Sequence, residues 1–184
     1  MRLTIESQAL PIGVKTVSLQ PHPDTRGIFT EVFRAHWDLG VLPLQWNVVH
    51  SEQNVLRGVH GHWRHGDYVV ALQGTITVGL KDLRLSSPTC GLAALIKLES
   101  RNPQGLVIPP GVAHGFFFHE PTLYIYAVSH YWDVADELGC RWDDPDLHLP
   151  WPCERPLLSP RDAHLPNLAT FTEALNNKLA ENLR

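Results

Sequence analysis

Short β-rich runs separated by turn residues fill the middle of the chain and restrict it to a sheet fold. Each run is rich in apolar side chains, and Gly, Pro, Asp and Ser interrupt the sequence between runs. No stretch in this part of the chain has the spacing of a long helix. The sequence therefore predicts strands over residues 68–72, 75–80, 92–98, 105–108 and 123–129.

The last part of the chain follows a different pattern. Apolar residues recur there at three- and four-residue spacing, which is typical of an amphipathic helix, at Leu168, Phe171, Leu175, Leu179 and Leu183. The spacing of Thr170 and Glu173 is typical of a capping box. We therefore expect a short C-terminal amphipathic helix over residues 168–183, packed on the sheets or on a partner subunit.

Length and charge narrow the class of protein. A chain of 184 residues with 43% hydrophobic content can bury a sizeable core, so we expect one domain over residues 1–184. A net charge of −4 with scattered Lys and Arg argues against nucleic acid as a partner. The apolar runs are too short to span a membrane, and the first residues lack an apolar signal region. We therefore expect no membrane partner and a cytoplasmic location.

Two histidines stand where a strand meets a tight turn. His60 ends the run VLRGVH (residues 55–60), and His114 lies in IPPGVAHGF (residues 108–116). A sheet that curls on itself can direct both turns into one cavity, so we expect the two histidines to share a site. An imidazole titrates near neutrality, which suits a general acid or base.

A series of short motifs in a fixed order carries a family resemblance over nearly the whole chain. The motifs are DTRGIFTE (24–31), QWN (45–47), LRGVH (56–60), DLR (82–84), SPT (87–89), PPGVAHGF (109–116), WDDP (142–145), WP (151–152) and SPRD (159–162). Together they resemble the dTDP-4-dehydrorhamnose 3,5-epimerase family of cupin-like proteins. The resemblance implies an all-β jelly-roll (cupin) barrel, and a homodimer that exchanges strands.

The same resemblance implies a nucleotide-sugar epimerase or isomerase without a cofactor. Its substrate would be a (d)TDP-linked 4-keto-6-deoxyhexose or a related keto sugar. His60 would be the base and Asp162 its carboxylate partner, while Arg57 and His114 would lie near the sugar carbonyl and stabilise the enolate. The residues expected at the nucleotide end are Arg26, Phe29, which could stack on a pyrimidine, Glu31, Gln45 and Asn47.

Trp132 departs from the family pattern at the position of a second catalytic group. The family has a tyrosine there, which returns a proton on the opposite face of the sugar. An indole N–H donates a hydrogen bond but does not ionise in the useful range. Tyr131 is adjacent, yet neighbouring strand residues point to opposite faces. We therefore expect epimerisation at a single carbon, and a non-catalytic nucleotide-sugar binder is a further hypothesis.

Two other departures support a metal-dependent alternative. Asp67 stands where the family usually has lysine, and His62 where it usually has glutamine. Residues His60 and His62 share one face of a strand, and with Asp67 and His114 they resemble the three-histidine, one-carboxylate pattern of the wider cupin superfamily. Such a set suits a divalent transition metal, and it would make His60 a ligand instead of a base. His65 is expected at the surface or in a structural role.

Overall fold

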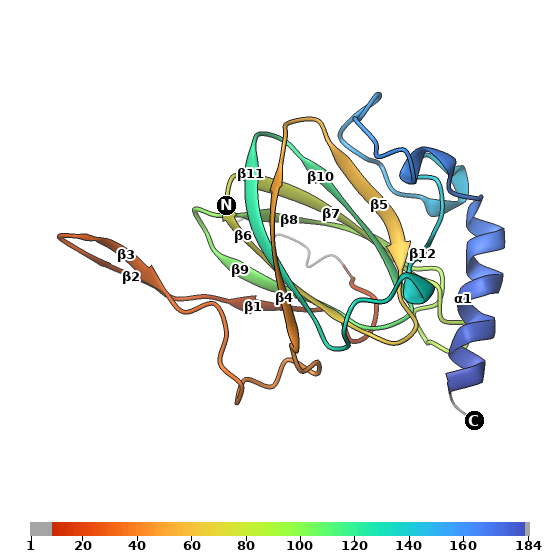
Figure 1. Cartoon of the computed structure of the whole chain (residues 1–184), viewed down its shortest axis with the longest axis horizontal. Coiled ribbons are helices and arrows are strands. Elements are labelled where there is room, and N and C mark those ends of the chain that lie inside the picture. The colour runs from red at the N-terminus through yellow and green to blue at the C-terminus, as the bar shows by residue number, and fades with distance from the viewer. Residues whose placement is uncertain (1–8, 183–184) are drawn as a thin grey trace, which may run out of the picture.

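Two five-stranded sheets form the body of the computed structural model, which describes residues 9–182 (Figure 1). The first sheet contains, in spatial order, β1 (Lys15–Ser18), β9 (Gln104–Ile108), β6 (Asp67–Gln73), β11 (Thr122–Val128) and β4 (Gln45–Ser51). The second contains β12 (Leu138–Gly139), β5 (Leu56–Gly61), β10 (Val112–Phe118), β7 (Thr75–Asp82) and β8 (Ala93–Glu99). All pairs of neighbouring strands in both sheets are antiparallel.

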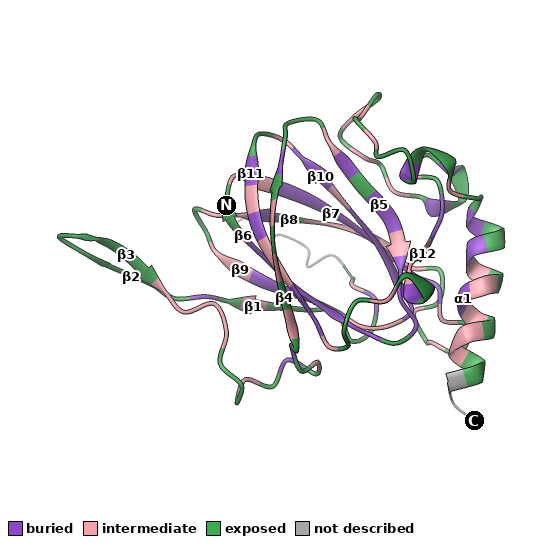
Figure 2. Ribbon diagram, viewed as in Figure 1, coloured by how far each residue is buried: buried purple, intermediate pink, exposed green. Residues whose placement is uncertain are grey.

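The main hydrophobic core lies between the two sheets. Ile76, Val78 and Leu80 alternate along β7 and are completely buried, because every second side chain of a strand points to the same face. They pack in one cluster with Val69 of β6 and Phe118 of β10. Burying each such side chain contributes about 2 kcal/mol to folding. Figure 2 shows the buried residues concentrated along the central strands of both sheets.

The all-β class and the five strands predicted from the sequence are confirmed, whereas closure into a barrel is wrong. Within residues 9–182, the hydrogen-bonded order of each sheet ends in an edge strand, namely β1 and β4 in one sheet and β12 and β8 in the other. No strand of one sheet pairs with a strand of the other there. Two twisted sheets bury a shared core by packing face to face, so closure is not needed.

The C-terminal helix α1 (Leu168–Asn182) packs against the second sheet, as Figure 1 shows. Its start differs from the predicted capping box, because Thr170 lies inside the helix and its backbone N–H donates to the Asn167 side chain at 2.9 Å. The apolar face is buried as expected in a second cluster made of Val59, Trp63, Leu83, Ala113, Cys140, Leu147, Leu168, Phe171 and Leu175. Residue 183 of the predicted helix lies outside the described residues.

A two-stranded hairpin projects away from both sheets (Figure 1). It consists of β2 (Pro21–Asp24) and β3 (Gly27–Thr30). In its turn, the Asp24 carboxylate accepts hydrogen bonds from the Arg26 backbone and guanidinium groups. Ile28 and Phe29 of the hairpin are 72% and 64% exposed, so apolar surface remains uncovered in the single chain.

Three short 3₁₀ helices complete the described elements: η1 (Val134–Asp136), η2 (Pro145–Leu147) and η3 (Asp162–His164). Among residues 9–182, no helix has both the length and the apolar character needed to cross a membrane.

Candidate active site

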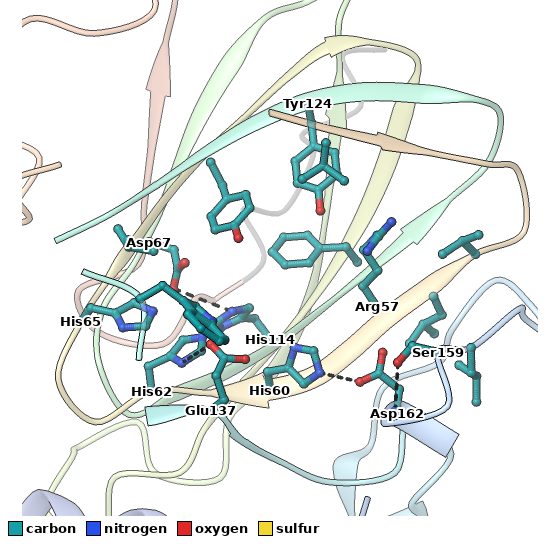
Figure 3. A pocket seen from close by; sticks show the side chains of 18 of the residues that line it. Arg57, His60, His62, His65, Asp67, His114, Tyr124, Glu137, Ser159 and Asp162 are labelled. Atoms are coloured by element: carbon teal, nitrogen blue, oxygen red, sulfur yellow. Dashed lines mark hydrogen bonds and ion pairs between the residues drawn. The ribbon is translucent and has the colours of Figure 1, made fainter. Parts of the chain in front are cut away.

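A pocket of about 430 Å³ opens between the sheets (Figure 3). This volume suits a small-molecule ligand. Its floor comes from β5, β6 and β10, one wall comes from β11, and the segments after β11 and around η3 close the sides. Of the predicted site residues, it collects His60, Asp162, Arg57, His114, Trp132, His62 and Asp67.

His60 and Asp162 form a hydrogen-bonded pair on the floor of the pocket. The His60 Nε2 lies 2.7 Å from Asp162 Oδ1. Burial of the Asp162 carboxyl disfavours its charge, but hydrogen bonds from His60, Ser159 and the Gly58 backbone outweigh burial and hold its pKa below the ordinary value. The carboxylate is therefore ionised at neutral pH and accepts the Nε2–H. The lone pair of His60 is then on Nδ1, which faces the pocket interior in Figure 3.

A local irregularity in β5 brings Arg57 and His60 to the same side of the strand. Regular alternation would place residues three apart on opposite faces. However, His114 pairs with His60 whereas Phe116 pairs with Arg57, so the register between β5 and β10 shifts by one residue. Gly58 lies in this irregular stretch with φ of +116°, a conformation that favours glycine. The RGVH motif therefore delivers both side chains to the pocket.

The Arg57 guanidinium is a positive charge available to an anion. Its Nε donates to Ser51 Oγ at 2.8 Å. Within the described part of the chain, no carboxylate forms an ion pair with it. Guanidinium groups bind phosphates and stabilise oxyanions through several N–H donors. Arg57 can therefore bind a phosphate of a substrate or stabilise an oxyanion that forms during its reaction.

His62, Asp67 and His114 gather at the inner end of the pocket, and we refer to them as the histidine–aspartate cluster. Their ligand-type atoms all lie within 4.8 Å of one another, and all three residues are buried. Burial and the neighbouring His65 lower the pKa of His62 to about 4. Burial also lowers the pKa of His114 well below its usual range and raises that of Asp67 to about 7. Both imidazoles are therefore neutral at pH 7.

The predicted four-residue metal set needs a correction, since only three of its members meet. His60 lies outside the cluster because Asp162 holds its ring. His65 instead adjoins the cluster, where its ring stacks on His62 with centroids 3.9 Å apart. It is 2% exposed, and its Nδ1 lies 2.8 Å from Asp136 Oδ2, so His65 is structural but not at the surface.

Two carboxylates beside the cluster were missed from the sequence, and both come from the segment after β11. Asp136 ends η1 and accepts hydrogen bonds from the backbone N–H groups of Trp63 and Arg64. Glu137 lines the pocket and pairs with Arg161 at 2.9 Å. They are more than seventy positions from His62 and His65 in sequence, so no local pattern connects them with these histidines.

The wall of the pocket carries phenol groups that were also missed. Tyr124 and Tyr126 occupy alternate positions on β11 and both line the cavity. Their alternation within a predicted strand was a usable signal. Burial raises the pKa of both phenols, so they keep their protons and can donate hydrogen bonds to a ligand. Trp132 stands half-exposed at the pocket edge, and its backbone N–H donates to Gln45 Oε1 at 3.0 Å.

The predicted nucleotide-end residues do not line the pocket of their own chain. Arg26 and Phe29 lie on the projecting hairpin, and Glu31 directly follows it and pairs with Arg34. Gln45 and Asn47 are on β4, where the Gln45 amide N–H donates to Asn47 Oδ1 at 3.0 Å. The expectation that all five face one bound nucleotide therefore fails within a single chain. The hairpin extends away from the body, which separates it from the cavity.

The fold and the site together define a class of protein. One pocket of this two-sheet, cupin-like fold holds a histidine–carboxylate pair and an arginine that has no carboxylate partner among residues 9–182. These are groups that proton-transfer enzymes use. The chain belongs to the dTDP-4-dehydrorhamnose 3,5-epimerase family, because the model of that family matches residues 9–170.

Individual relatives agree with this membership. A dTDP-4-dehydrorhamnose 3,5-epimerase of Neisseria gonorrhoeae is 34% identical over 87% of this chain, which spans about half (51%) of that relative. A dTDP-4-dehydrorhamnose 3-epimerase of Streptomyces niveus is 31% identical, with 88% of this chain and 83% of that protein covered. A solved epimerase from Legionella pneumophila, in complex with dTDP-4-keto-L-rhamnose, superposes with a TM-score of 0.82 at 31% identity, covering 89% of this chain and 92% of that one.

Proposed function

We propose that this protein epimerises a dTDP-linked 4-keto-6-deoxy sugar by removing a proton from a carbon next to the ketone. The observation that carries the proposal is the 2.7 Å contact between His60 and Asp162 inside the pocket. The names of the relatives and the dTDP-sugar in the Legionella structure support the choice of substrate. Proton removal and enolate stabilisation can be assigned to side chains of this chain.

Proton removal begins at the Nδ1 of His60, whose lone pair faces the pocket. As the imidazole takes up the proton it becomes cationic. The ionised Asp162, already bonded to Nε2, stabilises that cation and keeps the ring in one orientation. Abstraction leaves an enolate, whose negative oxygen is stabilised by the Arg57 guanidinium.

The return of the proton decides which product forms. Epimerisation requires a proton donor on the sugar face opposite His60. Trp132 offers only an indole N–H and cannot supply that proton. Solvent water, which reaches this half-exposed edge of the pocket, is the donor we propose, and we propose inversion at one carbon. The name of the Streptomyces niveus relative, a 3-epimerase, shows that single-carbon enzymes are among the relatives.

Solvent-deuterium exchange tests the proposed function directly. We expect dTDP-4-keto-6-deoxyglucose incubated with the protein in D₂O to gain deuterium at C3 or C5, as followed by proton NMR. Exchange at either carbon would exclude a protein that only binds nucleotide sugars. If neither carbon exchanges, although titration calorimetry shows that the sugar nucleotide binds, the epimerase proposal is wrong and the binder hypothesis replaces it.

Replacing Trp132 with tyrosine is expected to add a second exchange. The phenol would place an ionisable group of pKa near 10 at the position where the family has its acid. We expect the wild type to label one carbon and Trp132→Tyr to label both, as measured by NMR of the isolated sugar. Trp132→Phe, which keeps an aromatic ring without the hydroxyl, is the matched control. Efficient inversion of both carbons by the wild type would contradict the role given to Trp132.

We further propose a homodimer in which each hairpin reaches the pocket of the other subunit. The apolar side chains of the hairpin are exposed, and so are Trp46 and Val48 of the edge strand β4, at 40% and 66%. Apolar surface of this extent typically marks a protein interface, and an unpaired edge strand invites pairing. In such a dimer Arg26 and Phe29 would meet the nucleotide bound to the partner, which fits their distance from their own pocket.

Mixed dimers test whether the hairpin acts on the partner subunit. Arg26→Ala and His60→Asn chains, each inactive or weak alone, are co-expressed with different tags and purified as mixed dimers. If the hairpin acts across the interface, one site of each mixed dimer has both intact residues, so we expect about half of wild-type activity. If it acts within its own chain, both sites stay defective. Lack of recovery in a verified mixed dimer would contradict the exchange.

A further inference from the structure

The two imidazoles of the histidine–aspartate cluster each keep one ring nitrogen free of a proton. The Nδ1–H of His62 donates to the backbone carbonyl of Asp136 at 3.0 Å, and the Nδ1–H of His114 donates to the carbonyl of Val112 at 3.2 Å. Each neutral ring therefore keeps its lone pair on Nε2. A backbone carbonyl that fixes the tautomer in this way is a common feature of metal-binding histidines.

The carboxyl group of Asp67 lines the pocket beside the two imidazoles. The side chain is 7% exposed, and no described residue donates a hydrogen bond to it. Its nearest charged-type contact is the Nε2 of His114 at 3.8 Å, which carries a lone pair and not a proton (Figure 3). A carboxylate oxygen beside two imidazole lone pairs, all within 4.8 Å of one another, is a donor set that binds a transition-metal ion, so the geometry offers a place for a cation at the centre of the cluster.

A second group of three potential metal ligands lies beside the histidine–aspartate cluster, but its carboxylate is already hydrogen-bonded. His62, His65 and Asp136 also lie within 4.8 Å of one another. The Asp136 carboxylate, however, is already occupied by the N–H groups of Trp63 and Arg64 and by His65 at 2.8 Å. Its electron pairs are used within the protein, whereas those of Asp67 are free. The open site is therefore the one that contains Asp67.

We propose that His62, Asp67 and His114 bind one divalent transition-metal ion through two imidazole nitrogens and a carboxylate oxygen. Two histidines and one carboxylate suit iron, zinc, nickel or cobalt and leave coordination positions open towards the pocket. His60 is not a ligand in this arrangement. It stays available to Asp162, so a metal ion and the proton-transfer pair can occupy one pocket. The proposal concerns ion binding alone and does not depend on the epimerase activity.

Cobalt binding to the full chain provides the test. Protein purified without a metal-affinity tag is stripped with chelator, dialysed and titrated with Co²⁺, and visible absorption and elemental analysis are recorded. We expect one equivalent per chain with the ligand-field bands of a protein-bound ion. Asp67→Asn keeps the side-chain shape and is expected to weaken binding by about 100-fold, and so is His62→Gln. Circular dichroism and thermal unfolding establish that both variants are folded.

Two control variants define the ligand set. His60→Asn is expected to bind Co²⁺ like the wild type, because His60 is outside the cluster. His119→Ala removes a histidine that bonds Thr77 and does not line this pocket, and it should also bind normally. Binding of well under one equivalent of Co²⁺ by the wild type would overturn the proposal. A proton on Asp67 would then account for the burial of its carboxyl group. Equal binding by folded Asp67→Asn would overturn it as well.

Discussion

His60→Asn is expected to lower the rate of solvent-deuterium exchange into the keto sugar by about 10³-fold or more, because it removes the group that takes the proton. Asparagine retains an N–H that can donate to Asp162, so the packing around η3 should persist. Proton NMR in D₂O measures the rate, and thermal unfolding checks that the fold is intact.

Comparison with Asp162→Asn separates the base from its partner. Asp162 never contacts the sugar proton in this scheme; it orients His60 and stabilises the imidazolium. We expect a smaller rate loss from Asp162→Asn than from His60→Asn. His119→Asn, a change outside the pocket, should leave the rate unaltered. Exchange by His60→Asn at the wild-type rate would show that another group is the base.

Arg57→Ala is expected to lower kcat by about 10² to 10³-fold, because it removes the cation that stabilises the enolate oxygen. The guanidinium has no carboxylate partner among residues 9–182 in the single chain, so its loss leaves no buried charge unpaired. The fold should therefore tolerate the change. Steady-state kinetics with the dTDP-linked ketone provides kcat and KM separately.

The division between kcat and KM identifies what Arg57 does. A transition-state contact changes kcat, whereas a contact to the phosphates that is equally strong before and during reaction changes KM alone. Arg57→Lys keeps the charge but not the planar set of donors, so we expect it to recover part of the lost rate. A variant with normal kcat and a raised KM would assign Arg57 to phosphate binding.

The strands could be predicted because each is a short run rich in apolar and β-branched side chains that ends at turn residues. Ile76, Val78 and Leu80 belong to such a run, and β7 confirms it. The C-terminal helix was predicted from the 3.6-residue period of its apolar residues. Its cap was not, because Asn167 and Thr170 both have side chains that could cap a helix, and only the packed structure decides between them.

The site was less accessible from the sequence, because part of it depends on long-range placement. His60 and Asp162, more than one hundred positions apart, were paired through the family resemblance and not through spacing. The shift of register at Gly58 reverses the alternation that would otherwise separate Arg57 from His60. No periodicity in the sequence encodes that shift. The position of the hairpin could not be predicted either, because in the proposed dimer it depends on contacts with a second chain.

The segment that connects Trp132 to Gly139 serves several parts of the site at once. It carries Trp132 at the pocket edge, Asp136 and Glu137 beside the buried histidines, and Gly139, which pairs with His60 across β12 and β5. Surface loops usually accept insertions and deletions. Here a change of one residue would displace all four positions together. We therefore expect proteins that share this pocket to keep the length of this segment fixed.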